Sequence, residues 1–125
     1  MLAVEVENRS GAEVDEEGAV ALARRVLAAE DIEAGELGLA FVGEDEMRAL
    51  KREHLGIDEA TDVLSFPIDG RDALPAGVPR ALGDVVLCPQ VVGDAWPAPL
   101  VHGLLHLLGY DHGPEMQARE VALAP

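Results

Sequence analysis

The segment spanning residues 101–113 reads V-H-G-L-L-H-L-L-G-Y-D-H-G, and the rest of the chain must fold around it. It holds three of the chain's four histidines, His102, His106 and His112, at the spacing H-x3-H-x5-H. On a helix the first two lie one turn apart on the same face, where their ring nitrogens can reach one metal ion. Gly109 suits the left-handed turn that commonly ends a helix, and that turn can return His112 to the same ion. We therefore predict a metal site on this helix and the turn after it.

Three protein ligands leave one coordination position open, which is typical of catalytic rather than structural zinc. Zinc at such a site lowers the pKa of water to about 7. A single histidine on an apolar helix is more often a core residue, but three at this spacing, with a glycine before the third, are better explained as ligands. Imidazole also suits nickel and copper; we expect one Zn2+ per chain because of zinc's availability and the H-x3-H geometry.

The same segment has the skeleton of the metzincin motif, H-E-x-x-H-x-x-G-x-x-H, with one change. Gly103 stands where that motif has its glutamate. The glutamate is the general base that activates water in peptide hydrolysis. The sequence therefore predicts the metal site without the mechanism of an ordinary zinc protease.

The composition is that of one globular domain covering residues 1–125. Of these residues 49% are hydrophobic and 26% are charged, which is not the composition of a disordered chain. No apolar run approaches the ~20 residues of a membrane span, and the first residues lack the basic start of a secretion signal. The one cysteine, Cys88, excludes an internal disulfide and suits a reducing compartment. We expect a cytoplasmic protein without a membrane partner.

The net charge of −15 is unfavourable for a nucleic-acid partner, because an acidic surface repels phosphate chains. Cationic residues of the middle third can nevertheless form a local basic face. With His54, these residues are Arg48, Lys51, Arg52, Arg71 and Arg80. The alternative is that they are ordinary solvated surface charges.

Periodicity predicts the order β-α-β-α-β-β-α. Strands are expected over residues 2–7, 36–42, 61–67 and 83–88, where apolar residues alternate or run together between turn signals. Asp15 is an expected N-cap for a helix that ends at about Ala29, and a second helix is expected over roughly 44–55. The histidine helix is apolar on nearly every side and must be buried. This order predicts an α+β domain with one mixed sheet and the metal helix packed against it.

The remaining segments are expected to connect these elements. Residues 69–82 are rich in Gly, Pro and Arg and should form an exposed loop. Residues 89–99 contain three prolines and cannot form a long regular helix. After His112, residues 115–123 are long enough for one or two helical turns.

Three motifs, V-H-G-L-L-H-L-L-G-Y-D-H, T-D-V-L-S-F-P and L-G-D-V-V-L, together resemble the YbeY family of bacterial metal-dependent endoribonucleases. The resemblance implies a mixed four-stranded sheet with surrounding helices, and it implies that His102, His106 and His112 are zinc ligands. It further implies a single-strand-specific endoribonuclease of ribosomal RNA maturation, at the 16S 3′ end, and of ribosome quality control. The implied partners are single-stranded RNA, ribosomal RNA or the small subunit, and not DNA.

The chain departs from the family pattern beside the T-D-V-L-S-F-P motif. The family commonly has an arginine before the glycine that precedes this motif, and this chain has Leu55 before Gly56. Arg52, one turn earlier on the same helix, is our candidate for the catalytic cation, with Lys51 and Arg48 as alternatives. The segment 94–99 and the tail after His112 are also shorter than the resemblance leads us to expect.

The leading hypothesis is a zinc-dependent phosphodiesterase in which a nearby cation offsets charge in the transition state. Because Gly103 supplies no base, the nucleophile is either an activated water or the RNA 2′-OH. Asp111 is a candidate to hold a ligand imidazole in the required tautomer, or else it only stabilises the turn. Tyr110 and Trp96 are the candidates for stacking on bases. The rivals are a zinc hydrolase of another substrate and a non-catalytic ribosome-associated binding module with a structural metal.

Overall fold

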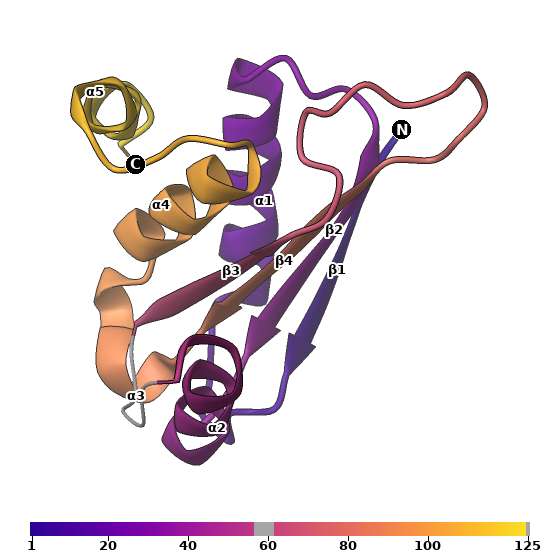
Figure 1. Ribbon diagram of the computed structural model, residues 1–125. Helices are drawn as coiled ribbons and strands as arrows, with labels where there is room; N and C mark the ends of the chain where they lie inside the picture. The colour runs from indigo at the N-terminus through magenta and orange to yellow at the C-terminus, as the bar shows by residue number, and fades with distance from the viewer. Residues whose placement is uncertain (57–61, 125) are drawn as a thin grey trace.

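A computed structural model describes residues 1–56 and 62–124 of the chain (Figure 1). Its strands are β1 (Leu2–Asn8), β2 (Gly35–Phe41), β3 (Val63–Pro67) and β4 (Ala81–Leu87). Its helices are α1 (Glu16–Ala29), α2 (Glu44–Leu55), α3 (Pro89–Val92), the 3-10 turn η1 (Gly93–Ala95), α4 (Pro97–Leu107) and α5 (Pro114–Ala122). The predicted order of strands and helices is confirmed, and α5 lies where helical turns were expected over residues 115–123. Helix α3 and the turn η1 are added between β4 and α4.

The four strands form one mixed sheet in the order β1-β2-β4-β3. The pairs β1–β2 and β2–β4 are parallel, and β3 pairs with β4 in the antiparallel sense. Parallel neighbours need a crossover, and α1 supplies it between β1 and β2. The predicted α+β domain with a four-stranded mixed sheet is therefore confirmed.

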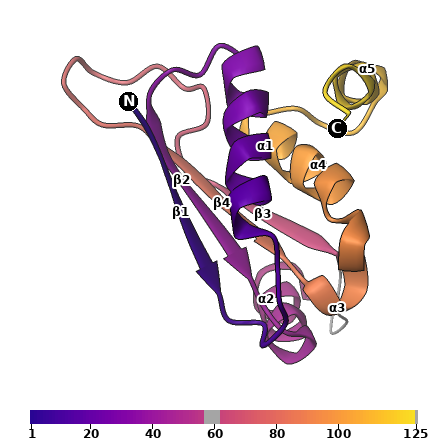
Figure 2. The ribbon, with the colours of Figure 1, turned by 180° about the vertical axis from the view of Figure 1, so that it is seen from behind.

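Helices cover the two faces of the sheet unequally. Both α1 and α4 lie on one face, and α2 lies on the other near one end of the strands (Figures 1 and 2). The central strand β4 shows the division: Val85 and Leu87 belong to the large core under α1 and α4, whereas Val86 packs in the smaller cluster beneath α2 with Met47. The site-bearing helix α4 is thus on the larger core.

Helix α4 is buried as its apolar sequence predicts. Leu100, Leu104 and Leu105 are each 0% exposed and belong to the large core. Pro97 is the first residue of the helix, where its fixed φ angle and missing N–H cost nothing. Gly109 follows the helix with a φ of 95°, the left-handed conformation that was predicted to end it. Within the described ranges, no helix has the length and apolar character needed to cross a bilayer.

Several predicted boundaries are accurate and others shift by a few residues. Helix α2 has the predicted bounds, and the Asp15 carboxylate accepts a hydrogen bond from Gly18 N at 2.9 Å as the predicted N-cap of α1. Strand β3 begins at Val63 rather than at 61, which lies outside the described residues. Strand β4 begins at Ala81, inside the predicted loop 69–82, because pairing with β2 extends to Glu36 and Ala81. A ladder partner thus overrides the weak strand preference of the local sequence.

The tight approach of α4 to the sheet requires a glycine at position 103. A Cβ atom there would lie 2.8 Å from Val85 Cγ1, 3.0 Å from Val63 Cγ2 and 3.1 Å from Ser65 Oγ. Ser65 Oγ also donates a hydrogen bond to the Gly103 carbonyl oxygen at 2.9 Å. The position where the metzincin motif has its glutamate therefore faces β3 and β4, with no room for a side chain.

We predict that Gly103→Ala lowers the free energy of unfolding. Alanine gains about 1 kcal/mol in helix propensity, but the new methyl meets two stiff valines, and overpacking of this kind costs about 1–3 kcal/mol. The expected net loss is about 1 kcal/mol, measured by urea unfolding. Ala118→Gly, at an exposed position of α5, is the control that reports helix propensity alone. A Gly103→Ala protein as stable as the wild type would contradict this account of the packing.

Candidate metal centre

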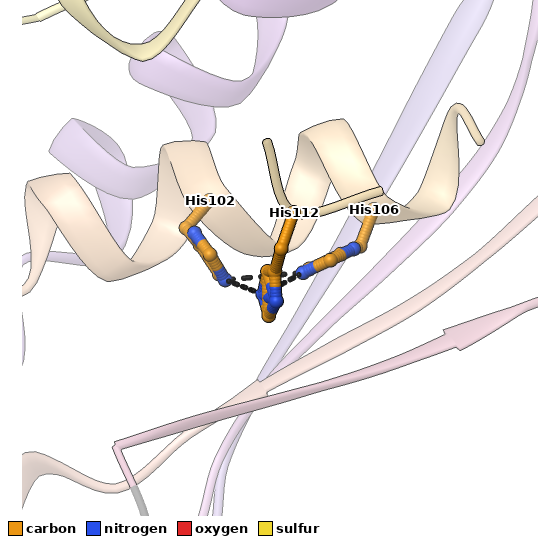
Figure 3. Close-up of side chains that lie close together, drawn as sticks. All are labelled: His102, His106 and His112. Carbon is orange, nitrogen blue, oxygen red and sulfur yellow. Dashed lines mark hydrogen bonds between the residues drawn. The ribbon is translucent and has the colours of Figure 1, made fainter. Parts of the chain in front are cut away.

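Three imidazole rings converge on one point beside α4 (Figure 3). His102 and His106 extend from the same face of the helix, and His112 comes from the turn that follows it. The Nε2 atoms of His102 and His106 are 3.1 Å apart, and that of His112 is 2.9 Å from His106 and 3.2 Å from His102. The spacing H-x3-H-x5-H therefore brings together the three residues predicted to be ligands.

These distances suit one tetrahedral ion. Zinc–nitrogen bonds of about 2.0–2.1 Å place two ligand nitrogens about 3.3 Å apart, slightly more than the separations seen here. The His106 Nδ1 atom lies 2.9 Å from the Tyr110 carbonyl oxygen, which can only accept, so Nδ1 carries the proton. The Nε2 of neutral His106 then presents a bare lone pair to its two neighbours. Converging lone pairs of this kind are satisfied by a cation.

The other helix histidine, His102, has a carboxylate beside its Nδ1 atom in place of a carbonyl oxygen. His102 Nδ1 lies 3.4 Å from a carboxylate oxygen of Glu120 on α5. An acceptor at Nδ1 favours the tautomer that leaves Nε2 free for a metal. Burial lowers the pKa of His106 below its ordinary value, and nearby His102 and His112 act in the same direction, against the Tyr110 carbonyl. His106 is therefore held in the neutral form that binds metals.

The three rings form part of the wall of an open cavity of about 740 Å³, large enough to admit a nucleotide. The wall is built by the end of α2, β3, α4, the turn after α4, and α5. Its carboxylates are Asp62, Asp111 and Glu120. Among the described residues that line it there is no lysine or arginine. A bound divalent ion would thus be the main positive charge in this cavity.

The two residues predicted to assist catalysis lie in different places. Asp111 lines the cavity. Among the described residues, however, the Nδ1 partner of His106 is the Tyr110 carbonyl and that of His102 is Glu120, not Asp111. Arg52 is exposed on α2 and is not one of the described lining residues, whereas Leu55, at the end of that helix, is. The structure therefore does not bring Arg52 together with the histidines. The catalytic roles of Arg52 and Asp111 stay predictions.

The basic face is not assembled as a single surface. Arg71 pairs with Glu30, and Arg80 donates hydrogen bonds to the carbonyl oxygens of Gly70 and Asp72 in the loop between β3 and β4. These two arginines therefore stabilise the loop and its contacts. The cationic residues of α2 are separated from them along the sheet (Figure 1).

Sequence reasoning missed a buried carboxylate close to the site. Glu30, at the C-terminal cap of α1, is 6% exposed. Its Oε1 accepts hydrogen bonds from Tyr110 OH at 2.6 Å and from Arg71 at 2.7 Å, and its Oε2 accepts one from Arg119 Nε at 2.8 Å. These partners are 41 to 89 positions away in sequence, so no local pattern could reveal them.

The partners of Glu30 keep it ionised. Burial alone raises the pKa of this carboxyl group, but the hydrogen bonds from Tyr110 and Arg119 and the charges of Arg119 and Arg71 lower it by more. The net pKa lies below the ordinary value of 4.5. Glu30 is thus a buried anion stabilised by two cations and a hydroxyl group.

A sequence profile described as "Endoribonuclease YbeY" matches residues 5–123 of the chain. An "Endoribonuclease YbeY" from Halorhodospira halophila is 46% identical over 98 residues, covering 70% of this chain and 64% of that protein. Another, from Salinispora tropica, is 36% identical over 140 aligned positions, covering 96% of this chain and 89% of that protein. The second alignment is longer than the chain, so this relative has residues without a counterpart here.

A solved structure shares the fold. The solution structure of TM1509 from Thermotoga maritima matches with a TM-score of 0.58 and 24% sequence identity, covering 98% of this chain and 86% of that one. At this identity the likeness shows the fold alone, and it agrees with the single α+β domain described above.

We predict that Glu30→Gln lowers the free energy of unfolding at pH 7 by about 2 kcal/mol, the usual worth of hydrogen bonds to a charged group. Because the folded-state pKa of Glu30 is depressed, its stabilisation is present above the unfolded-state pKa and is lost as pH falls through the lower folded-state value. The difference between the two proteins should therefore shrink from pH 7 to pH 3 in urea unfolding.

The matched control is Glu33→Gln, a neighbouring exposed carboxylate, which should leave stability within about 0.5 kcal/mol of the wild type. A Glu30→Gln effect of equal size at both pH values would contradict the role given to the ionised carboxylate.

Proposed function

The chain belongs to the YbeY family of endoribonucleases, hydrolases that act on RNA, and from this membership we propose that it is a zinc-dependent enzyme that cleaves single-stranded RNA. The proposed centre is formed by His102, His106 and His112, with one zinc ion per chain. The observation that carries the proposal is the convergence of three Nε2 atoms, 2.9 to 3.2 Å apart, on the wall of an open cavity. A site that is both closely spaced and accessible suits catalysis better than a sealed structural site.

The chain's own groups prepare this centre for phosphodiester chemistry. When bound, zinc supplies a Lewis acid that polarises a phosphoryl oxygen and lowers the pKa of water. The Tyr110 carbonyl and the Glu120 carboxylate hold the two helix imidazoles with Nε2 toward the cavity. Position 103 cannot supply a base because it faces the sheet. The nucleophile in this proposal is an activated water or the RNA 2′-OH, and Asp111 is the candidate to orient an imidazole.

The acidity of the protein limits how RNA can approach. The protein has a net charge of −15, and three carboxylates lie in the cavity wall, so the protein as a whole repels the phosphate chain of RNA. Only local positive charge can attract that chain. The position of Leu55, at the end of α2 on the cavity wall, supports a contact between the cationic residues earlier in α2 and the chain of phosphates outside the cavity. We assign Arg52 to that flanking contact.

The proposed substrate in the cell is ribosomal RNA, at the 3′ end of 16S rRNA, on the small subunit in the cytoplasm, with a role in ribosome quality control. Support for this comes from the family resemblance of the three sequence motifs. Nothing in the proposal requires DNA or a membrane.

We predict that protein purified without a histidine tag carries one zinc per chain and cleaves a labelled single-stranded RNA. Chelation should abolish cleavage and added zinc should restore it, and His102→Ala should lose both metal and cleavage. The control is His54→Ala, because the fourth histidine packs against Phe66 on α2's side of the sheet. A cyclic 2′,3′-phosphate product indicates attack by the 2′-OH, and a 5′-phosphate indicates attack by water.

One zinc per chain without cleavage, together with a melting temperature that collapses on mild chelation, would overturn the catalytic proposal. Those results would favour a ribosome-associated binding module with a structural metal. Cleavage of an amide or a small phosphoester in place of RNA would favour a different zinc hydrolase.

We also predict that Leu55→Arg increases cleavage by roughly tenfold. Leu55 is 57% exposed on the cavity wall, so a guanidinium there can reach a phosphate, though solvent weakens its effect below the 10²–10³ of a buried donor. The measurement is kcat/KM at low and high salt, with the gain smaller at high salt. Leu55→Gln is the uncharged control, and an equal gain in it would show that charge is not the cause.

A further inference from the structure

The buried carboxylate of Glu30 has no part in the chemistry proposed above, yet it is linked to the metal centre. It is the C-cap residue of α1, the helix that packs with α4 in the large core. Its three partners come from the loop after β3, the turn after α4, and α5. Two of these segments are the ones that carry the outer contacts of the ligand histidines.

We propose that Glu30 and Tyr110 are positioning residues of the metal centre: the buried carboxylate fixes Tyr110, and the Tyr110 backbone carbonyl fixes the tautomer and orientation of His106. The inference rests on the proposed function only in that a metal binds to the three histidines. It concerns how the ligands are held, whatever bond the enzyme cleaves.

Tyr110 is fixed at both ends of the residue. Its hydroxyl group donates to Glu30 Oε1 at 2.6 Å, and the Arg71 guanidinium carbon lies 5.7 Å from the centre of its ring. Its backbone N–H donates to the Leu105 carbonyl oxygen at 3.1 Å. The direction of the Tyr110 carbonyl is thereby set, and this carbonyl accepts the hydrogen bond from His106 Nδ1 at 2.9 Å. The residue also lies two positions before His112.

The same carboxylate reaches the other helix ligand through α5. Glu30 Oε2 accepts a hydrogen bond from Arg119 Nε, and the next residue, Glu120, contacts His102 Nδ1. Glu30 is therefore linked to His106 through Tyr110, and to His102 through the neighbouring residues Arg119 and Glu120. The buried carboxylate is paired with both Arg71 and Arg119, so the cluster joins the end of α1 to the loop after β3 and to α5.

Outer contacts of metal ligands matter for affinity as well as for geometry. Their removal typically weakens metal binding by about 10–100-fold. Loss of the Tyr110 hydroxyl leaves the carbonyl present but less well directed, so the lower end of that range is expected. Loss of the Glu30 charge releases both Tyr110 and α5, so the upper part of the range is expected.

The test measures zinc affinity by competition with a chromophoric chelator, together with the visible absorption spectrum of the Co2+-loaded protein, without any RNA. Tyr110→Phe should bind zinc roughly tenfold more weakly and change the Co2+ spectrum, which reports ligand geometry directly. Glu30→Gln should weaken binding by about 10–100-fold. The double variant Tyr110→Phe/Glu30→Gln should bind zinc no more weakly than Glu30→Gln alone, because both changes interrupt the same chain of contacts.

Arg25→Gln is the matched control. Arg25 lies on α1 and donates to the Leu123 carbonyl oxygen at 2.8 Å, so it joins α1 to the end of α5 without touching Glu30 or Tyr110. Its loss should reduce stability while zinc affinity and the Co2+ spectrum stay within about twofold of the wild type.

A Tyr110→Phe protein with wild-type zinc affinity and Co2+ spectrum would overturn the proposal, and so would an equal loss of affinity in Arg25→Gln. If Glu30→Gln does not fold, Tyr110→Phe decides alone, since it keeps the carboxylate and both arginines. A protein that shows the expected losses of zinc affinity but cleaves no RNA would overturn the proposed function and leave this inference standing.

Discussion

The close packing of α4 on the sheet at Gly103 is the constraint on which the site depends. A side chain at this position would overlap Val63, Val85 or Ser65, so the helix can lie this close only where the residue is glycine. Once α4 is seated, its rotation is fixed by its buried leucines and by the hydrogen bond from Ser65 to the Gly103 carbonyl. His102 and His106, at positions i and i+4 on the adjacent face, then both point into the cavity. The catalytic base found at this position in metzincins is excluded by the same packing.

Charge has opposite effects on the metal and on the RNA. Neutral imidazoles leave the double positive charge of a bound divalent ion uncompensated, and the carboxylates of the cavity wall favour a cation there. The same carboxylates and the net charge of −15 repel a polyphosphate. In the proposed mechanism the metal therefore provides most of the local attraction for a phosphodiester, and the α2 cations are proposed to assist it at a distance. Leu55, where the family pattern has arginine, makes this dependence on the metal stronger.

Local patterns predicted those parts of the structure that depend on local interactions. The helix period, the acidic start and the basic end of α2 are all encoded within residues 44–55, and its predicted bounds are correct. The histidine cluster was predictable because H-x3-H fixes two ligands on one helix face and Gly109 permits the turn to the third. The start of β4 at Ala81 was not, because it depends on pairing with β2. The orientation of α2, which directs Leu55 rather than Arg52 to the cavity, depends on tertiary packing.

The Glu30 cluster shows why the remaining part of the site could not be found by pattern. Glu30 stands at the end of an amphipathic helix, and nothing in its neighbours distinguishes it from the exposed Glu33. It becomes a buried anion only because α5 and the loop after β3 each bring an arginine to it. In return, the carboxylate gives α5, predicted only as one or two turns, an anchor besides its buried Met116. The last helix, the turn that carries His112 and the end of the first helix are thus joined by one ion cluster. In the proposed metal centre, the stability of the C-terminal segment and the geometry of the three histidines then have a common physical origin.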